Sequence, residues 1–125
     1  MNRPDASNAI NTRMGQELLR YFEEMNLEPG DVRCIVLTGA GKVFSAGADI
    51  KSRGNVGSVP GETNRHLRRT REVGFCIMES NKPVIAAVNG PALGAGLGLV
   101  ICCDIILASE NAVFGLPEID IGLMG

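Results

Sequence analysis

The sequence has no long apolar run, a single histidine and almost no excess of charge of either sign. The longest apolar stretch, residues 92–103, contains three glycines and is well short of the roughly 20 residues that a membrane helix needs. The amino-terminal segment MNRPDASNAIN is polar and lacks the apolar region of a secretion signal. These absences predict a soluble, cytoplasmic protein that does not enter a membrane.

The charge balance and the few metal-ligating side chains exclude two further classes of protein. Lys and Arg number 12 against 14 Asp and Glu, for a net charge of −2; such a chain lacks the basic surface that binds nucleic acid. The sequence has one imidazole, His66, and no CxxC spacing, so we expect no metal site. We predict buried, reduced thiols for all four cysteines, which are Cys34, Cys76, Cys102 and Cys103.

Glycine is the residue that the sequence has in excess, at 16 of 125 residues. The apolar share of 45% and the charged share of 21% are those of an ordinary globular protein, and the length suits one domain. Without a collagen-like period, these glycines indicate turns where backbone approaches backbone or a ligand closely.

The apolar pattern alternates between helical and strand periods. Apolar residues every three or four positions predict a helix over 11–25 with Asn11 as its N-cap; they are Ile10, Met14, Leu18, Phe22 and Met25. The expected inner stripe of the helix 62–80 consists of Leu67, Thr70, Val73 or Gly74, and Ile77. Unbroken apolar runs predict strands that are covered on both faces. In chain order we expect the helix 11–25, a strand 34–37, a loop 51–61, a helix 62–80, a strand 83–88, a glycine-rich turn 90–96, a helix 97–102, a strand 104–108 and the start of a fourth strand at 113–114. This order predicts an α/β fold with mostly parallel strands.

Two glycine-rich segments invite a nucleotide-binding interpretation that their spacing does not support. Gly39-Ala40-Gly41-Lys42 resembles the end of a phosphate loop, but valines occupy the positions of its first glycine and its Mg²⁺-binding hydroxyl. In Gly94-x-Gly96-x-Gly98 the third glycine of a GxGxxG motif would fall at Leu99.

The segments 45–49 and 93–96 are free of side-chain bulk, and each is expected to follow a buried strand. Side by side, their amide groups would form an oxyanion hole. Tight packing of two turns in a dense α/β core is the alternative explanation.

Four motifs in a fixed order resemble the crotonase (enoyl-CoA hydratase/isomerase) superfamily. Residues 44–51, FSAGADIK, resemble its F-x-A-G-A-D-[IL]-K segment. KPVIAAVNG at 82–90, ALGAG at 92–96 and CDII at 103–106 resemble its second signature. NRPDASNA at 2–9 and FGLPEIDIG at 114–122 match near the two ends of the sequence.

The resemblance implies a crotonase-like spiral of ββα turns and an acyl-CoA thioester as substrate. Residues 1–125 would be part of a single acyl-CoA-binding domain. Because family members are about twice this length, we expect the opening hairpin and the C-terminal helices to be missing, leaving an incomplete fold. Trimers, or dimers of trimers, are the implied assembly, and no cofactor besides the coenzyme A of the substrate is implied.

The resemblance also assigns roles to residues of this sequence. The backbone N–H groups of Ala48 and Ala95 would hold the oxygen of a thioester enolate, and Glu118 would be the catalytic acid/base. The implied substrate-binding residues are Ala6, Ala46, Asp49, Ile50, Lys51 and Gly94.

One position departs from the family pattern. Hydratases of the family use two carboxylates; here Glu118 fills the second position and Gly98 occupies the first. We expect that a Glu introduced in place of Gly98 would risk a steric clash. One carboxylate can still move a proton between carbons, as the family's isomerases do. We therefore predict an acyl-CoA hydratase or isomerase that uses Glu118; the alternative is a catalytically weak acyl-CoA-binding or oligomer-forming protein.

Three expectations concern charged and apolar surfaces. Asp120 would share a face with Glu118 if the segment were extended, although a solvated side chain is favoured. The arginines of the second helix could contact CoA phosphates, with a solvated face as the default; they are Arg65, Arg68, Arg69 and Arg71. The apolar end, 114–125, predicts an exposed apolar patch.

Overall fold

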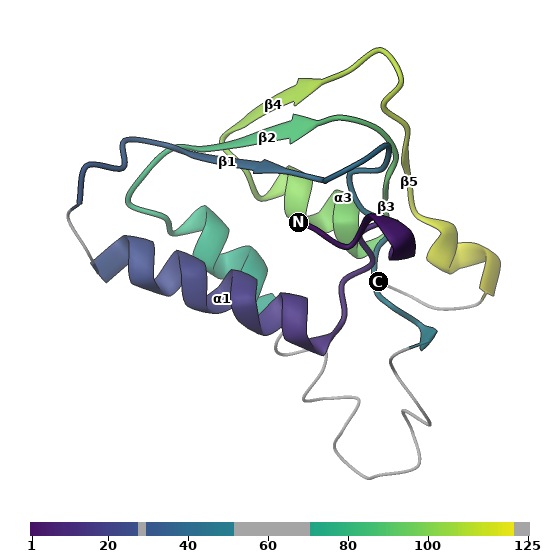
Figure 1. Ribbon diagram of the computed structural model, residues 1–125, viewed down its shortest axis with the longest axis horizontal. Helices are drawn as coiled ribbons and strands as arrows, with labels where there is room; N and C mark the ends of the chain where they lie inside the picture. The colour runs from purple at the N-terminus through teal and green to yellow at the C-terminus, as the bar shows by residue number, and fades with distance from the viewer. Residues whose placement is uncertain (28–29, 52–70, 122–125) are drawn as a thin grey trace, which may run out of the picture.

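The computed structural model describes residues 1–27, 30–51 and 71–121 (Figure 1). In chain order its elements are the 3-10 helix η1 (Pro4–Ala6), α1 (Thr12–Leu27), β1 (Ile35–Thr38), a helical stretch at 71–78, β2 (Val84–Val88), β3 (Ala92–Leu93), α3 (Ala95–Ile101), β4 (Ile105–Ala108), β5 (Phe114–Gly115) and the 3-10 helix η3 (Pro117–Ile121). The fold is α/β, and within these described ranges each strand pair is parallel, in line with the mostly parallel sheet that the sequence predicts.

The larger sheet has the strand order β1-β2-β4, with Val36 paired to Ile85 and Ile85 paired to Ile105. Helix α1, the stretch 71–78 and α3 all lie on one face of this sheet (Figure 1). The core forms between these helices and the sheet. Its buried members are Phe22, Ile35, Leu37, Phe44, Val73, Ile77, Val84, Ala86, Val88, Ala92, Leu99 and Val100.

The smaller sheet pairs β3 with β5, and two isolated bridges extend it. Ser45 bridges to Ala92, and Ala48 bridges to Ile10. Four short segments that are far apart in sequence therefore lie side by side in the order 10, 45–48, 92–93 and 114–115. This second layer brings the small-residue segments together.

Helix α1 begins where a local signal places it and ends at Leu27, two residues beyond the predicted end. The side chain of Asn11 accepts a hydrogen bond from the N–H of Met14 (2.9 Å), which confirms Asn11 as the N-cap. At the other end, Lys82 Nζ donates to the carbonyl of Met25 (2.8 Å), so a cation satisfies one of the last carbonyls. The buried face carries Met14 and Phe22, two members of the predicted apolar stripe.

The prediction that the strands are covered on both faces is wrong for the larger sheet, since even in β2 only one face is buried while Ile85 and Ala87 on the other are half-buried. Strand β1 alternates between buried and exposed residues, with Val36 57% exposed, and all four residues of β4 are exposed. The physical reason is that the described helices cover one face of the sheet, and β4 lies at its edge. The outer face therefore carries a row formed by Val36, Ile85 and Ile105, which share a side of the sheet through their pairing.

Several boundaries also differ from the sequence-based expectations. Residues 92–93, predicted as turn, form the strand β3, and α3 begins at Ala95 rather than at Leu97 because Gly94 is its N-cap. The fourth strand is confirmed as β5. In the predicted helix 62–80, Val73 and Ile77 are buried as expected, whereas Leu67, Thr70 and the loop prediction from residue 52 onward lie outside the described residues.

Candidate active site

The two small-residue segments predicted to meet are in direct contact. The N–H of Ser45 donates to Pro91 (3.1 Å), and the N–H of Leu93 donates to the carbonyl of Ser45 (2.9 Å). Gly47 lies against the next turn, since a β-carbon added there would lie 2.7 Å from the carbonyl oxygen of Leu93 and 3.3 Å from the nitrogen of Ala95. With φ at +91° and no room for a side chain, Gly47 lets the segment 45–48 approach the start of α3.

The backbone N–H groups of Ala48 and Ala95 are both left available by this arrangement. In the parallel bridge the carbonyl of Gly47 and the N–H of Asp49 bond to Ile10, at 2.8 and 3.0 Å, so the N–H of Ala48 points away from Ile10. Ala95 is the first residue of α3, where an N–H has no partner within the helix. Among the hydrogen bonds of the described residues, none uses either N–H.

The carboxylate of Glu118 lies at the same turn. Strand β5 holds β3 through Ala92 N–H to Val113 (2.8 Å) and Gly94 N–H to Gly115 (2.9 Å), which brings η3 beside the start of α3. A β-carbon on Gly94 would lie 2.0 Å from Glu118 Oε1, so the absent side chain of Gly94 makes the space for the carboxylate. Glu118 Oε2 is buried and has no hydrogen-bond partner among the described residues. A buried oxygen of this kind calls for an explanation, because such groups are nearly always paired.

Asp120 does not join this site. The segment after β5 is a 3-10 helix rather than an extended strand, so the condition for a face shared by Glu118 and Asp120 is not met, and the favoured prediction of a solvated Asp120 side chain is confirmed. Asp120 is exposed while Glu118 is half-buried, and the Asp120 side chain therefore remains in solvent.

Gly98, which the resemblance puts at the position of the first carboxylate, lies on α3. A β-carbon there would meet no atom of the described residues outside its own helix within 4 Å. The clash expected of a Glu at this position is therefore not found at its β-carbon among these residues.

The structure places the other predicted substrate-binding residues around the segment 45–51. Ala46, Ile50 and Lys51 are exposed, and Ala6 is half-buried in η1. The side chain of Asp49 is only 11% exposed and is ion-paired with Arg3 (3.0 Å). Of the four arginines considered, Arg71 alone lies in the described region, with its guanidinium 5.8 Å from the centre of the Phe75 ring.

Two residues that support the segment leading to 45–49, Arg3 and Asn8, were not singled out from the sequence. Asn8 is completely buried at a φ of +52°. Its side chain accepts from the N–H of Arg3 (2.8 Å) and donates to the carbonyls of Ala40 (2.8 Å) and Val43 (2.7 Å). Both residues belong to the motif NRPDASNA, so the signal was present, but nothing in the sequence says which segments an asparagine side chain will join.

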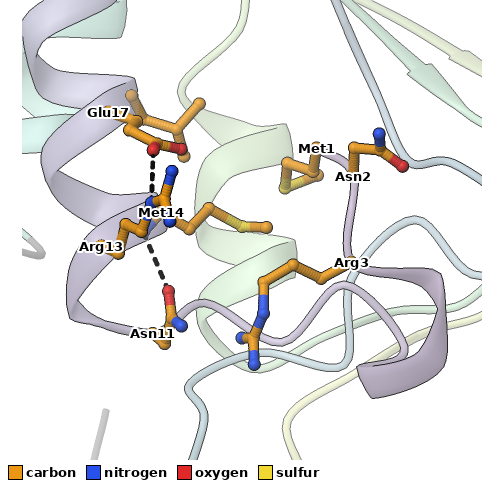
Figure 2. A pocket seen from close by; sticks show the side chains of 8 residues that line it. Met1, Asn2, Arg3, Asn11, Arg13, Met14 and Glu17 are labelled. Atoms are coloured by element: carbon orange, nitrogen blue, oxygen red, sulfur yellow. Dashed lines mark hydrogen bonds and ion pairs between the residues drawn. The ribbon is translucent and has the colours of Figure 1, made fainter.

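A hollow of about 510 Å³ lies between α1 and the amino-terminal segment (Figure 2). Its lining includes the apolar side chains of Met1, Met14 and Leu18, and the ion pair of Arg13 with Glu17 (2.7 Å). Figure 2 shows Met14 pointing into the hollow and Arg3 crossing its edge. None of Ala48, Ala95 and Glu118 lines it, so it is separate from the turn that holds the candidate catalytic groups.

The cysteines are free thiols, but none of them is fully buried. Cys34 is exposed, which corrects the prediction for this residue, while Cys76, Cys102 and Cys103 are half-buried. Burial, followed by the neighbouring Cys102 and Asp104, raises the pKa of Cys103 to about 11.

Two kinds of site are not found within residues 1–27, 30–51 and 71–121. No group of three His, Cys, Asp or Glu side chains there could hold a metal ion. No helix in that part of the chain has the length and apolar character needed to span a membrane.

The described helices and the parallel pairing of the strands define the chain as an α/β protein. The model of the family "Enoyl-CoA hydratase/isomerase" matches residues 1–125. The chain therefore belongs to the enoyl-CoA hydratase/isomerase family, and its fold is the crotonase fold.

Relatives with named activities and solved structures agree with this assignment. A 2,3-dehydroadipyl-CoA hydratase from Escherichia coli is 39% identical over 125 residues, covering 99% of this chain and 47% of the relative. A mevalonyl-coenzyme A hydratase from Beauveria bassiana is 40% identical over 130 residues, covering 99% and 46%. The crystal structure of an enoyl-CoA hydratase/isomerase from Marinobacter aquaeolei matches with a TM-score of 0.92 at 34% identity, covering 99% and 49%. The chain spans about half the length of the relatives it matches.

Proposed function

We propose that the protein moves a proton on an acyl-CoA thioester, with Glu118 as the acid/base and the N–H groups of Ala48 and Ala95 as the oxyanion hole. The observation that carries this proposal is the buried Oε2 of Glu118, which has no hydrogen-bond partner within residues 1–27, 30–51 and 71–121 and lies beside the turn that presents the Ala95 amide. A buried carboxylate oxygen with a free lone pair can accept a proton from a bound molecule. Family membership supports coenzyme A thioesters as the substrate class.

The proposed reaction is an allylic isomerisation. Glu118 removes a proton from C2 of a 3-enoyl-CoA, and the electron pair moves onto the thioester oxygen. The two amides stabilise the negative charge on that oxygen. The protonated Glu118 then returns the proton to C4, which gives the 2-enoyl-CoA and restores the carboxylate. One acid is sufficient for this sequence, which fits Gly98 at the first acid position.

Hydration of a 2-enoyl-CoA is the second candidate, because named relatives are hydratases. It needs a group that positions the attacking water, and a glycine at position 98 provides no side chain for this. A protein that binds acyl-CoA or forms oligomers with weak catalysis is the remaining alternative.

We further propose that the protein is cytoplasmic and acts as a homotrimer or hexamer, with residues 1–125 as part of one acyl-CoA-binding domain. We also propose that Ala6, Ala46, Ile50 and Lys51 line the groove that binds coenzyme A.

The test compares two substrates and two variants in the protein at its natural full length. Wild type should convert a 3-enoyl-CoA faster than it hydrates the matching 2-enoyl-CoA. Glu118→Gln keeps the side-chain shape, so the proton transfer rate should fall by about 10²–10⁴-fold while thioester binding is kept. Asp120→Asn, an exposed carboxylate on the same 3-10 helix, is the matched control and should leave both rates unchanged. Equal rates for Glu118→Gln and wild type would overturn the proposal.

A further inference from the structure

We propose that Arg3 is a positioning residue that holds the Ala48 amide in its catalytic orientation through Asp49. This inference rests on the proposed function, because it assigns a role toward one of the two oxyanion donors. It begins from the ion pair between Arg3 Nη1 and Asp49 Oδ2, which measures 3.0 Å. Asp49 directly follows Ala48, so its side chain is anchored one peptide away from the donor.

Arg3 contacts both segments that define the direction of the Ala48 N–H. Its guanidinium donates to the carbonyl of Ala9, the residue before Ile10, as well as to Asp49. Ile10 in turn bonds to the carbonyl of Gly47 and to the N–H of Asp49. The planar guanidinium therefore links the segment at Ile10 to the segment at Asp49. Both peptide neighbours of Ala48, Gly47 and Asp49, are held in this way.

Arg3 is itself held in place by buried structure. The side chain of Asn8, completely buried, accepts from the N–H of Arg3 at 2.8 Å. The carbonyl of Arg3 accepts from the N–H groups of Ala6 (3.0 Å) and Asn8 (2.9 Å). The support thus runs from the buried Asn8 to Arg3, then to Asp49 and to the Ala48 peptide, which is the kind of second layer that fixes a catalytic geometry.

This contact changes the role expected for Asp49. The family resemblance implies that Asp49 lines the coenzyme A groove, but its carboxylate faces Arg3 and is mostly buried. We therefore assign the Asp49 side chain to the support of the oxyanion turn rather than to direct contact with the substrate.

The experiment uses Arg3→Gln, with Arg13→Gln as the matched control, in the protein at its natural full length. Both arginines line the hollow of Figure 2 and both are ion-paired, but Arg13 pairs with Glu17 on the exposed surface of α1. The first readout separates kcat from KM on a 3-enoyl-CoA. The second is the infrared stretch of the thioester carbonyl in a bound saturated acyl-CoA, whose shift to lower frequency reports how strongly the two amides polarise it.

Arg3→Gln should lower kcat by about 10-fold or more, because small displacements of a catalytic group are costly. It should change KM little and reduce the carbonyl shift. Asp49→Asn, which keeps the shape of the side chain, should have the same effect, and the double variant should add little to either single one. Arg3→Lys should recover part of the rate, since an ammonium can still pair with Asp49. Arg13→Gln should match wild type in every readout.

The outcomes separate this inference from the proposed function. A folded Arg3→Gln protein with wild-type kcat and an unchanged carbonyl shift would refute the role of Arg3 and leave the proposed function intact. A wild type without turnover on any enoyl-CoA would instead refute the proposed function. If Arg3→Gln does not fold, the Asp49→Asn variant decides by the same two readouts.

Discussion

Replacing Gly94 with alanine tests whether the position of the Glu118 carboxylate depends on the missing side chain at this turn. The added β-carbon would lie 2.0 Å from Oε1 and 2.8 Å from the carboxyl carbon of Glu118. Real β-carbons almost never approach another heavy atom within 3.0 Å, so the carboxylate must retreat by about 1 Å or more. A displacement of this size reduces a catalysed rate by about 10²-fold.

The same substitution also strains the backbone. Gly94 has φ at +52° and ψ at −121° as the N-cap of α3, a positive-φ region that glycine populates readily and that costs an L-residue about 1–3 kcal/mol. Thermal unfolding should therefore shift down by a few degrees in Gly94→Ala while the protein stays folded at 25 °C. Measuring kcat together with the binding of a saturated acyl-CoA separates the loss of geometry from the loss of folded protein. We expect kcat to fall while the binding of the saturated acyl-CoA is retained.

Two comparisons make this prediction specific. Gly15→Ala, on α1 with nothing within 4 Å of the added carbon, should keep wild-type kcat and stabilise the helix. In a Glu118→Gln background, Gly94→Ala should change kcat little further, because the base that it displaces is already absent. A folded Gly94→Ala protein with wild-type kcat would refute the reasoning, and so would fully additive losses in the double variant.

Further predictions concern the amide donor, the vacated acid position and the thiols. Ala95→Pro removes one donor N–H and should lower kcat by about 10²–10³-fold; an unchanged rate in a variant shown to be folded by circular dichroism would sink the assignment. Gly98→Glu should raise the rate of 2-enoyl-CoA hydration, since open space surrounds the β-carbon there; an unaltered rate in the folded variant would show that water positioning is not what the site lacks. Iodoacetamide at pH 8 should modify the exposed Cys34 well before Cys103, whose pKa of about 11 keeps it protonated. Burial raises the pKa of Cys103 in the folded state, so the unfolded state loses this proton first as the pH rises from about 9 to 11, and the contribution of Cys103 to the free energy of unfolding should decline over that range. Urea unfolding of wild type and of Cys103→Ala at several pH values measures this decline. An equal pH dependence of the two proteins would contradict the prediction.

The sequence determined the helices with a clear apolar period and the strands of the larger sheet. The stripe of α1 and the Asn11 cap are local signals, and Met14, Phe22, Val73 and Ile77 are buried as their spacing predicts. Unbroken apolar runs predicted β2 and β4, because such a run is also a signal carried by residues that are neighbours in sequence. The lack of bulk at 45–49 and 93–96 indicated a close approach of backbone, but it did not distinguish an oxyanion hole from the tight packing of two turns.

The tertiary structure alone decided which faces are covered and which polar groups meet. An apolar strand carries no information about what packs on it, so the exposure of Val36 and Leu107 follows only from where the helices lie. The 3-10 turn at Glu118 and the two-residue strand β3 depend on pairing between segments far apart in sequence. The contact of Arg3 with Asp49, 46 residues away, is likewise set by the bridge between Ile10 and Ala48. Long-range backbone pairing thus places the carboxylate and the two amides at one turn, and no local pattern specifies that arrangement.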